Sequence, residues 1–209
     1  MPAQLPEVQW IELAGNPWGV RLLDVRPVTQ HMLSTSSDPQ CAANAVSFGG
    51  DDGSSFIGQE PPDPRTAKVN LSYRIGGTLK DGVLFTPTAM EHKWALFYHR
   101  RQILCVRSWR RKVFAVAETE ERENSIVISQ IRGVLCAEQE EPEFTARVLD
   151  FLLRSHALDL VYPVPLLPGL EQDPGKAALW CLSCFGNRAQ FATSEILARE
   201  VPEKALHTR

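Results

Sequence analysis

The stretch from Trp94 to Thr119, WALFYHRRQILCVRSWRRKVFAVAET, decides the fold. Its three runs are rich in Val, Ile and aromatic residues, which favour β-strands. Only the short breaks Arg100–Gln102 and Arg110–Lys112 separate them. Breaks this short favour antiparallel neighbours, because parallel strands need a long crossover. The stretch therefore predicts the centre of an antiparallel β meander.

More strands of similar composition are expected before and after this stretch in the sequence. The strands expected are Lys68–Ile75, Val83–Thr86, Trp94–His99, Ile103–Trp109, Val113–Thr119 and Ser125–Ile131. Within the strand that begins at Trp94, apolar side chains point alternately to both faces of the sheet. A sheet that is apolar on both faces must be covered on both sides.

An amphipathic helix over Pro142–His156 is the first expected cover. Its apolar stripe recurs at helical spacing. The stripe consists of Phe144, Val148, Phe151, Leu152 and Ser155. The other cover is expected from either the N-terminal segment or the C-terminal helix.

The C-terminal part is expected to be helical. Asp173 can cap a helix that starts at Pro174, and Gly186 is a natural end for it after Phe185. A last helix is expected over Phe191–Glu200, and Val201–Arg209 is expected to be a frayed tail.

The N-terminal part carries weaker patterns. Val20–Val25 is expected to be a short strand, and Asp38 followed by Pro39 predicts a helix to about Ser47. Glycine- and proline-rich sequence then favours a mobile surface loop. The expected organisation is one α+β domain over 1–209: an N-terminal segment 1–66 with a mobile loop 48–66, a β meander 67–136 and a helical part 141–200.

Composition limits the classes of function. Among 209 residues, hydrophobic residues make up 44% and charged residues 22%, which are values typical of globular proteins. The net charge is −3, so bulk attraction to nucleic acid or to anionic membranes is not expected. No apolar run approaches the ~20 residues that span a bilayer, and the first residues lack the pattern of a signal peptide. A cytoplasmic location is the expectation.

The five cysteines are scattered along the chain, which predicts reduced thiols rather than a disulfide framework. Cys181 and Cys184 follow Trp180 in a C-x-x-C string that also occurs in thioredoxin-like redox sites. Here the string falls late in a helix, where the helix dipole gives a thiolate little help. A zinc site would need two further ligands. Two buried thiols are the expectation, and no metal or cofactor is expected.

The charges are the most informative feature for function. Seven basic residues and no acidic residue occur between Lys93 and Lys112. The meander gathers several of them at one end, beside tryptophan. The candidate anion-binding residues are His92, Lys93, Trp109, Arg110, Arg111, Lys112 and Arg132. Guanidinium groups beside aromatic rings suit a phosphate or a carboxylate. The alternative is that Glu138, Glu140, Glu141 and Glu143 fold back over this end and neutralise it.

Three functional hypotheses follow. The first is a non-enzymatic binding or regulatory module that recognises an acidic protein segment or a phosphorylated small molecule at this basic end. The second is an enzyme in which His92 or His99 acts in acid–base catalysis and arginines orient an anionic substrate. The third is a scaffold protein that uses the glycine-rich loop Phe48–Gly58 as its interface.

Overall fold

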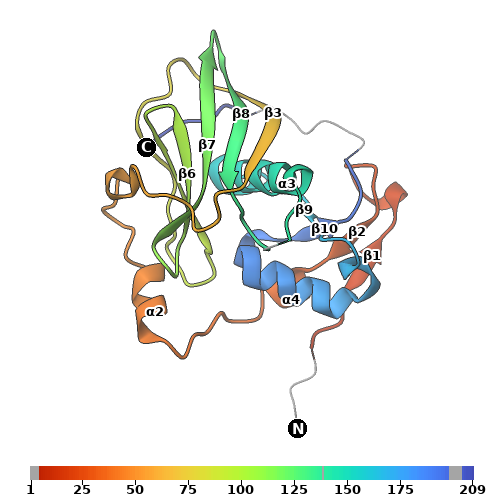
Figure 1. The fold of residues 1–209 in the computed structure, drawn as a ribbon. Helices are drawn as coiled ribbons and strands as arrows, with labels where there is room; N and C mark the ends of the chain where they lie inside the picture. The colour runs from red at the N-terminus through yellow and green to blue at the C-terminus, as the bar shows by residue number, and fades with distance from the viewer. Residues whose placement is uncertain (1–4, 138, 198–203) are drawn as a thin grey trace.

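A computed structural model describes residues 5–137, 139–197 and 204–209, and in this part of the chain it contains two β-sheets and four α-helices (Figure 1). The larger sheet has six strands in the order β3-β8-β7-β6-β5-β4, and all its neighbours are antiparallel. Its strands are β3 (Thr66–Arg74), β4 (Gly82–Phe85), β5 (Trp94–His99), β6 (Gln102–Arg107), β7 (Lys112–Arg122) and β8 (Ser125–Gly133). The predicted α+β class and antiparallel meander are confirmed.

Chain order and spatial order agree from β4 to β8, as the short connections require. The first strand departs from this order. β3 lies at the far edge of the sheet beside β8, so that Lys68 is opposite Gln130. The connection from β3 to β4 therefore crosses from one edge of the sheet to the other.

The two faces of the sheet are covered by different parts of the chain. Trp94, Leu96 and Tyr98 belong to the main core, on the side of the helices. On the opposite face Phe97 packs in a smaller cluster with Phe48 from the N-terminal segment. The N-terminal alternative for the second cover is therefore confirmed.

The long helices begin and end close to the predicted residues. α3 (Pro142–Leu152) continues into a π-helical turn, Leu153–Ala157, and lies between β3 and β9 (Figure 1). α4 (Pro174–Phe185) begins at Asp173, whose side chain accepts a hydrogen bond from the backbone N–H of Lys176. Gly186 ends it at φ 64°, in the left-handed region that glycine tolerates.

Two shorter helices precede the sheet. α2 (Pro39–Ala45) is capped by Asp38 as predicted, and α1 (Arg26–Thr29) packs against α4. Single 3₁₀ turns are η1 (Leu13–Gly15), η2 (Ser54–Phe56), η4 (Leu170–Gln172) and η5 (Gly186–Arg188). η2 lies in the segment that was expected to be a mobile loop, and its Phe56 is buried against Phe97.

The smaller sheet combines two strands from the N-terminal part of the chain with two from the C-terminal part. Its order is β1 (Gln9–Ile11), β2 (Leu22–Asp24), β10 (Phe191–Thr193) and β9 (Val164–Pro165). The predicted strand near Val20–Val25 is confirmed, but the helix predicted over Phe191–Glu200 is wrong at its start. Ala192 is buried between Leu23 and Val164, and this pairing overrides the local helical pattern. Residues 198–200 lie outside the described residues.

The C-terminal tail was predicted to be frayed, and residues 204–209 contradict this. The backbone N–H of Leu206 donates to the carbonyl of Arg74 at the end of β3, with an N···O distance of 2.8 Å. The backbone N–H of Arg209 donates to the carbonyl of Val83 in β4 at 2.8 Å. The tail thus connects the two free edges of the large sheet; residues 201–203 of the predicted tail lie outside the described residues.

Membrane insertion through a helix finds no support in the described residues, where every helix is too short or too polar to cross a bilayer.

Candidate functional site

A cleft of about 590 Å³ lies where the large sheet meets the C-terminal half of α4. Three of the predicted anion-binding residues line it: Lys93, Trp109 and Arg110. The wall also includes Arg107, which the sequence analysis did not select. The cleft collects side chains from the residue before β5, from β6 and the turn after it, from β7, and from segments on either side of the sheet in sequence.

Lys93 is the most unusual residue of the cleft because its ammonium group is buried. The residue is 4% exposed, and its Nζ donates to Ser34 Oγ at 2.6 Å and to the carbonyl of Met90 at 3.0 Å. Burial, and secondarily the charge of Arg107, lower the pKa of Lys93 to about 8. Among the described residues, no carboxylate lies within ion-pair distance of Nζ.

The acidic residue that affects the pKa of Lys93 is already engaged elsewhere. Glu91 raises the pKa of Lys93 only as a minor cause. Its Oε1 accepts a hydrogen bond from the backbone N–H of Ser34 at 3.0 Å. Within the described part of the chain, Lys93 is therefore a buried cation without a paired anion, an arrangement that is costly in a folded protein.

Trp109 forms the floor beneath this charge. Lys93 Nζ lies 3.9 Å from the centroid of the Trp109 ring, which is a cation–π contact. The indole Nε1 of Trp109 donates to the carbonyl of Met90 at 2.9 Å and fixes the ring. The tight turn after β6 places Arg110 beside it at the mouth of the cleft, with its side chain exposed.

Arg107 holds the sheet to the end of α4. Its Nη1 donates to the carbonyl of Cys184 at 2.6 Å and its Nη2 to that of Ser183 at 2.7 Å. These carbonyls are at the C-terminal end of the helix, where positive charge is favourable. Burial lowers the pKa of Arg107, although the guanidinium stays protonated at any physiological pH.

The electrostatic character of the cleft is uniformly positive. Its charged wall residues are Lys93, Arg107 and Arg110, and its described lining contains no aspartate or glutamate. The other surfaces of the cleft are largely apolar, including Phe114 and Leu182. Such a site suits a group that combines a negative charge with an apolar body.

Arg111 does not belong to this site. Its guanidinium forms an ion pair with Asp51 and donates to Ser47 Oγ at 2.8 Å. It lies 4.4 Å from the centroid of the Phe48 ring, on the opposite face of the sheet. Its charge is neutralised by the N-terminal cover, so it serves to hold that cover in place.

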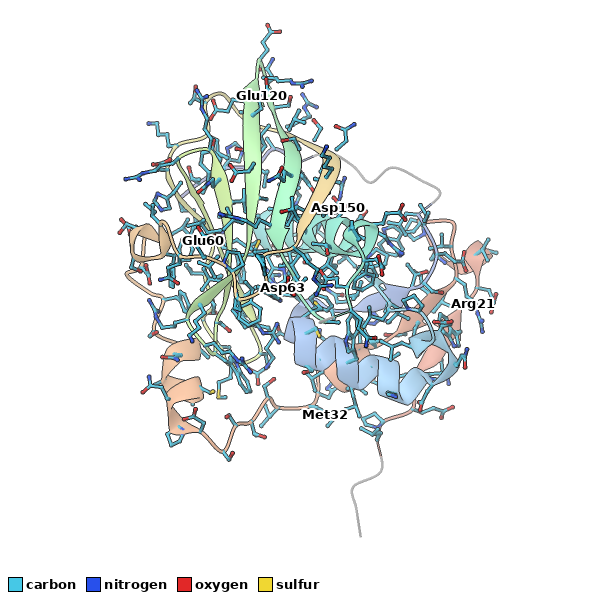
Figure 2. All side chains as sticks on the ribbon, viewed as in Figure 1. Arg21, Met32, Glu60, Asp63, Glu120 and Asp150 are labelled. Carbon is cyan, nitrogen blue, oxygen red and sulfur yellow. The ribbon has the colours of Figure 1, made fainter. Side chains whose placement is uncertain are left out.

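The remaining predicted residues are also outside the cleft lining. Arg132 Nη1 pairs with Glu60 at 2.7 Å, and Figure 2 shows Glu60 on the segment between η2 and β3. Lys112 is exposed. His92 is half-buried, its Nδ1 accepts from the backbone N–H of Thr88 at 3.1 Å, and burial lowers its pKa.

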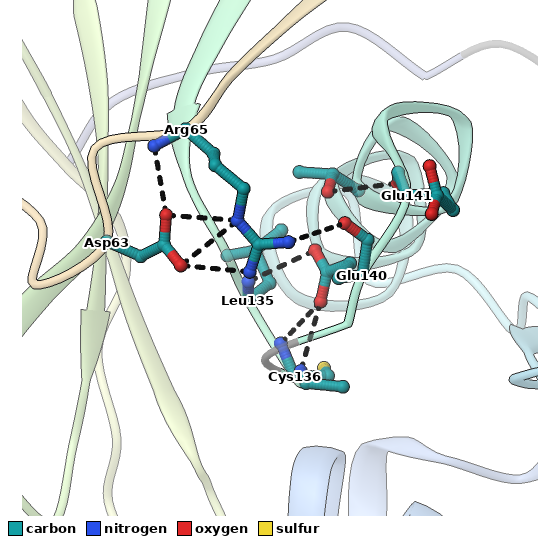
Figure 3. Close-up of polar contacts among 8 residues, drawn as sticks. Asp63, Arg65, Leu135, Cys136, Glu140 and Glu141 are labelled. Carbon is teal, nitrogen blue, oxygen red and sulfur yellow. Dashed lines mark hydrogen bonds and ion pairs between the residues drawn. The ribbon is translucent and has the colours of Figure 1, made fainter.

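The glutamates after β8 were the expected alternative partners of the basic end. In the part of the chain that the structure describes, Glu140, Glu141 and Glu143 form no ion pair with Arg110 or Arg111. Glu140 instead points into its own loop, where its carboxylate accepts hydrogen bonds from three successive backbone N–H groups (Figure 3). Glu138 lies outside the described residues.

The cysteines are free thiols, and their spatial grouping differs from the C-x-x-C string. Cys181 is fully buried, and burial raises its pKa. Cys184 lies on the cleft wall beside Cys136, which comes from the loop after β8. Within the described residues no three His, Cys, Asp or Glu side chains are close enough together to hold a metal ion.

A second cavity, of about 750 Å³, lies between β3 and α3, and the Asp150 carboxylate in its wall is fully engaged. Asp150 accepts hydrogen bonds from Tyr73 at 2.6 Å and from Tyr162 at 2.7 Å, and it pairs with Arg154 at 2.7 Å. Figure 2 shows Asp150 on α3. With its charge already compensated, this network is explained as structural.

The fold and the cleft define an α+β protein with a basic, partly apolar cleft. Comparison of the chain with protein-family models, with curated proteins and with solved structures finds no match in any of the three.

Proposed function

We propose that the protein is a non-enzymatic binding module that takes an anionic group into the cleft lined by Lys93, Trp109 and Arg110. The observation that carries the proposal is the buried ammonium of Lys93 without a carboxylate partner among the described residues. A bound anion would offset the cost of burying this charge. A cytoplasmic location is part of the proposal and fits five free thiols.

The chemistry of the wall defines the ligand class. Lys93 supplies a point charge at the bottom and Arg110 can form paired hydrogen bonds at the mouth. Trp109 and Phe114 offer aromatic surface to the uncharged part of the ligand. The shared chemistry is a phosphate or carboxylate attached to an apolar body, which either a phosphorylated small molecule or an acidic protein segment could present.

The geometry favours this proposal over acid–base catalysis. Neither His92 nor His99 lines the cleft or the second cavity. The Nε2 of His99 is 2.7 Å from the carbonyl of Asp52, and its Nδ1 is 3.6 Å from Asp81, so the ring connects loops at the other end of the sheet. The glycine-rich interface is also less favoured, because Phe48 and Phe56 are turned into the sheet.

Calorimetric titration of the full chain with three probes tests the proposal. The probes are inorganic phosphate, phenyl phosphate and a peptide rich in aspartate with one aromatic residue, each at low and at higher salt. We expect Arg110→Glu to weaken binding at least about tenfold, or about 1.4 kcal/mol. Lys112→Glu is the matched control, since it makes the same charge change on an exposed side chain outside the cleft. Higher salt should weaken binding by screening.

Each outcome has a defined meaning. Binding of phenyl phosphate alone identifies a small-molecule site, and binding of the peptide alone identifies a protein partner. No binding by any probe, or equal losses in Arg110→Glu and Lys112→Glu, would remove the proposal.

A further inference from the structure

Two cysteines far apart in sequence meet in the wall of the cleft. Cys184 is in the last turn of α4 and Cys136 is in the loop that follows β8. Both line the cleft, and each thiol is close enough to the other to shift its pKa. The C-x-x-C string points to Cys181 as the partner of Cys184, but Cys181 faces the core and does not line the cleft.

The loop that carries Cys136 is fixed by three hydrogen bonds to one carboxylate. The Glu140 carboxylate accepts from the backbone N–H groups of Leu135 at 3.1 Å, Cys136 at 2.8 Å and Ala137 at 3.2 Å (Figure 3). Glu140 is only 3% exposed, so water competes little for these bonds. The loop therefore presents the Cys136 thiol from a defined position.

Cys184 is held from the other side by Arg107, which donates to the carbonyls of Cys184 and Ser183. These two hydrogen bonds connect the last turn of α4 to β6. The two thiols are thus fixed by independent anchors, one on the helix and one on the loop.

The charges around the pair make the two thiols unequal. The hydrogen bond from Cys136, and then the positive charge of Arg107, lower the pKa of Cys184. Burial chiefly raises the pKa of Cys136, and the negative charge of Glu140 adds to this. The C-terminal end of α4 opposes a thiolate at Cys184 through the helix dipole, and the guanidinium bound to the same carbonyls offsets it. Cys184 is therefore the thiol of the pair that deprotonates more readily.

We propose that Cys136 and Cys184 form a reversible disulfide in the cleft wall by exchange with a low-molecular-weight disulfide. The proposal does not depend on the anion-binding function.

The exchange proceeds in two balanced steps. The Cys184 thiolate attacks one sulfur of the external disulfide, whose S–S bond breaks and releases one thiolate that takes up a proton. Cys136 then loses its proton to solvent and attacks the Cys184 sulfur of the mixed disulfide. The Cys136–Cys184 bond forms as the second small thiolate leaves. Two protein thiols are oxidised, and one disulfide is reduced to two thiols.

The test uses the full chain equilibrated with glutathione disulfide and glutathione, followed by non-reducing proteolysis and mass spectrometry. We expect a linked peptide pair that contains Cys136 and Cys184, with free thiols falling from five to three. Cys181→Ala is the matched control and should form the same link. In Cys136→Ser, a mixed disulfide should accumulate on Cys184, since the resolving thiol is gone.

Any oxidised product that lacks the Cys136–Cys184 link would overturn the proposal, including a Cys181–Cys184 bond or a mixed disulfide at Cys41 alone. Five thiols that stay free across the glutathione series would overturn it as well. An unchanged far-ultraviolet circular dichroism spectrum of the wild-type protein establishes that each result belongs to the folded chain.

Discussion

At the scale of single residues, the cleft depends on the ammonium group of Lys93, whose burial lowers the stability of the folded protein. Lys93 has two hydrogen-bond acceptors and an aromatic ring beside its Nζ, yet burial still lowers its pKa to about 8. Residues that are unfavourable for stability are frequently retained for binding. The same residue should therefore have opposite effects on stability and on affinity.

Lys93→Met tests this opposition. At pH 7 we expect the variant to be more stable than the wild type by on the order of 1–2 kcal/mol, because the cost of burying the ammonium disappears. The variant should also lose binding of phenyl phosphate. Urea unfolding measures the first effect and calorimetry the second. A variant that is less stable than the wild type at pH 7 would contradict this account of Lys93.

The stability difference should depend on pH in a stated direction. Below pH 8 the side chain is charged in both the folded and the unfolded state, and the cost of burial is fully present. Between about 8 and the usual value of 10.5 the folded state releases the proton first, so wild-type stability rises relative to Lys93→Met. Lys112→Met, an exposed control, should show no such trend.

At the scale of elements, the N-terminal cover shows how a glycine-rich segment can be well packed. Phe48 and Phe56 stack near Phe97, and Arg111 lies over both N-terminal rings. Gly53 passes directly over the Phe97 ring at φ 85°. Glycine is needed there for two separate reasons, a left-handed backbone and the absence of a Cβ.

Two glycine substitutions separate these reasons. Gly58 has a similar φ of 79°, but a Cβ there would meet nothing within 4 Å. Gly58→Ala should therefore cost about 1 kcal/mol, the backbone term alone. Gly53→Ala should cost about 3 kcal/mol, because its Cβ also collides with the Phe97 ring. Chemical denaturation of both variants measures the difference, and equal losses would argue against this packing.

At the scale of the whole molecule, the two ends of the chain complete the two sheets. The N-terminal strand β2 pairs with β10 in the smaller sheet, and residues 204–209 connect β3 to β4 in the larger one. Leu206 is 1% exposed and joins the main core. The tail therefore contributes to stability although it has no regular secondary structure.

Leu206→Ala should lower the free energy of unfolding by about 2–4 kcal/mol through the cavity it leaves. Ile196→Ala is the control in the same region of sequence, because Ile196 is 83% exposed, and its effect should stay within about 0.5 kcal/mol. Thermal or urea unfolding of the full-length variants measures both. Similar stabilities for the two variants would show that the tail is not part of the cooperative core.

The sequence alone determined those helices and strands whose order and ends depend on neighbouring residues in the chain. Short turns set the order from β4 to β8, and the caps at Asp38 and Asp173 set where α2 and α4 begin. Only the tertiary structure decided the partners of distant segments: β3 beside β8, β10 beside β2, and Cys136 beside Cys184.

The residues of the candidate site also fall into two groups, those that the sequence predicted and those that only the structure revealed. The run of basic residues and the predicted meander selected Lys93, Trp109 and Arg110, but they could not separate these from Arg111, which the structure pairs with Asp51. It also passed over Arg107, whose side chain faces the cleft only in the observed register opposite Trp94. A shift of one residue turns every side chain of a strand to the other face. The rest of the wall comes from the end of α4 and the loop after β8, segments far from the hairpin in sequence, and no local pattern encodes their packing against it.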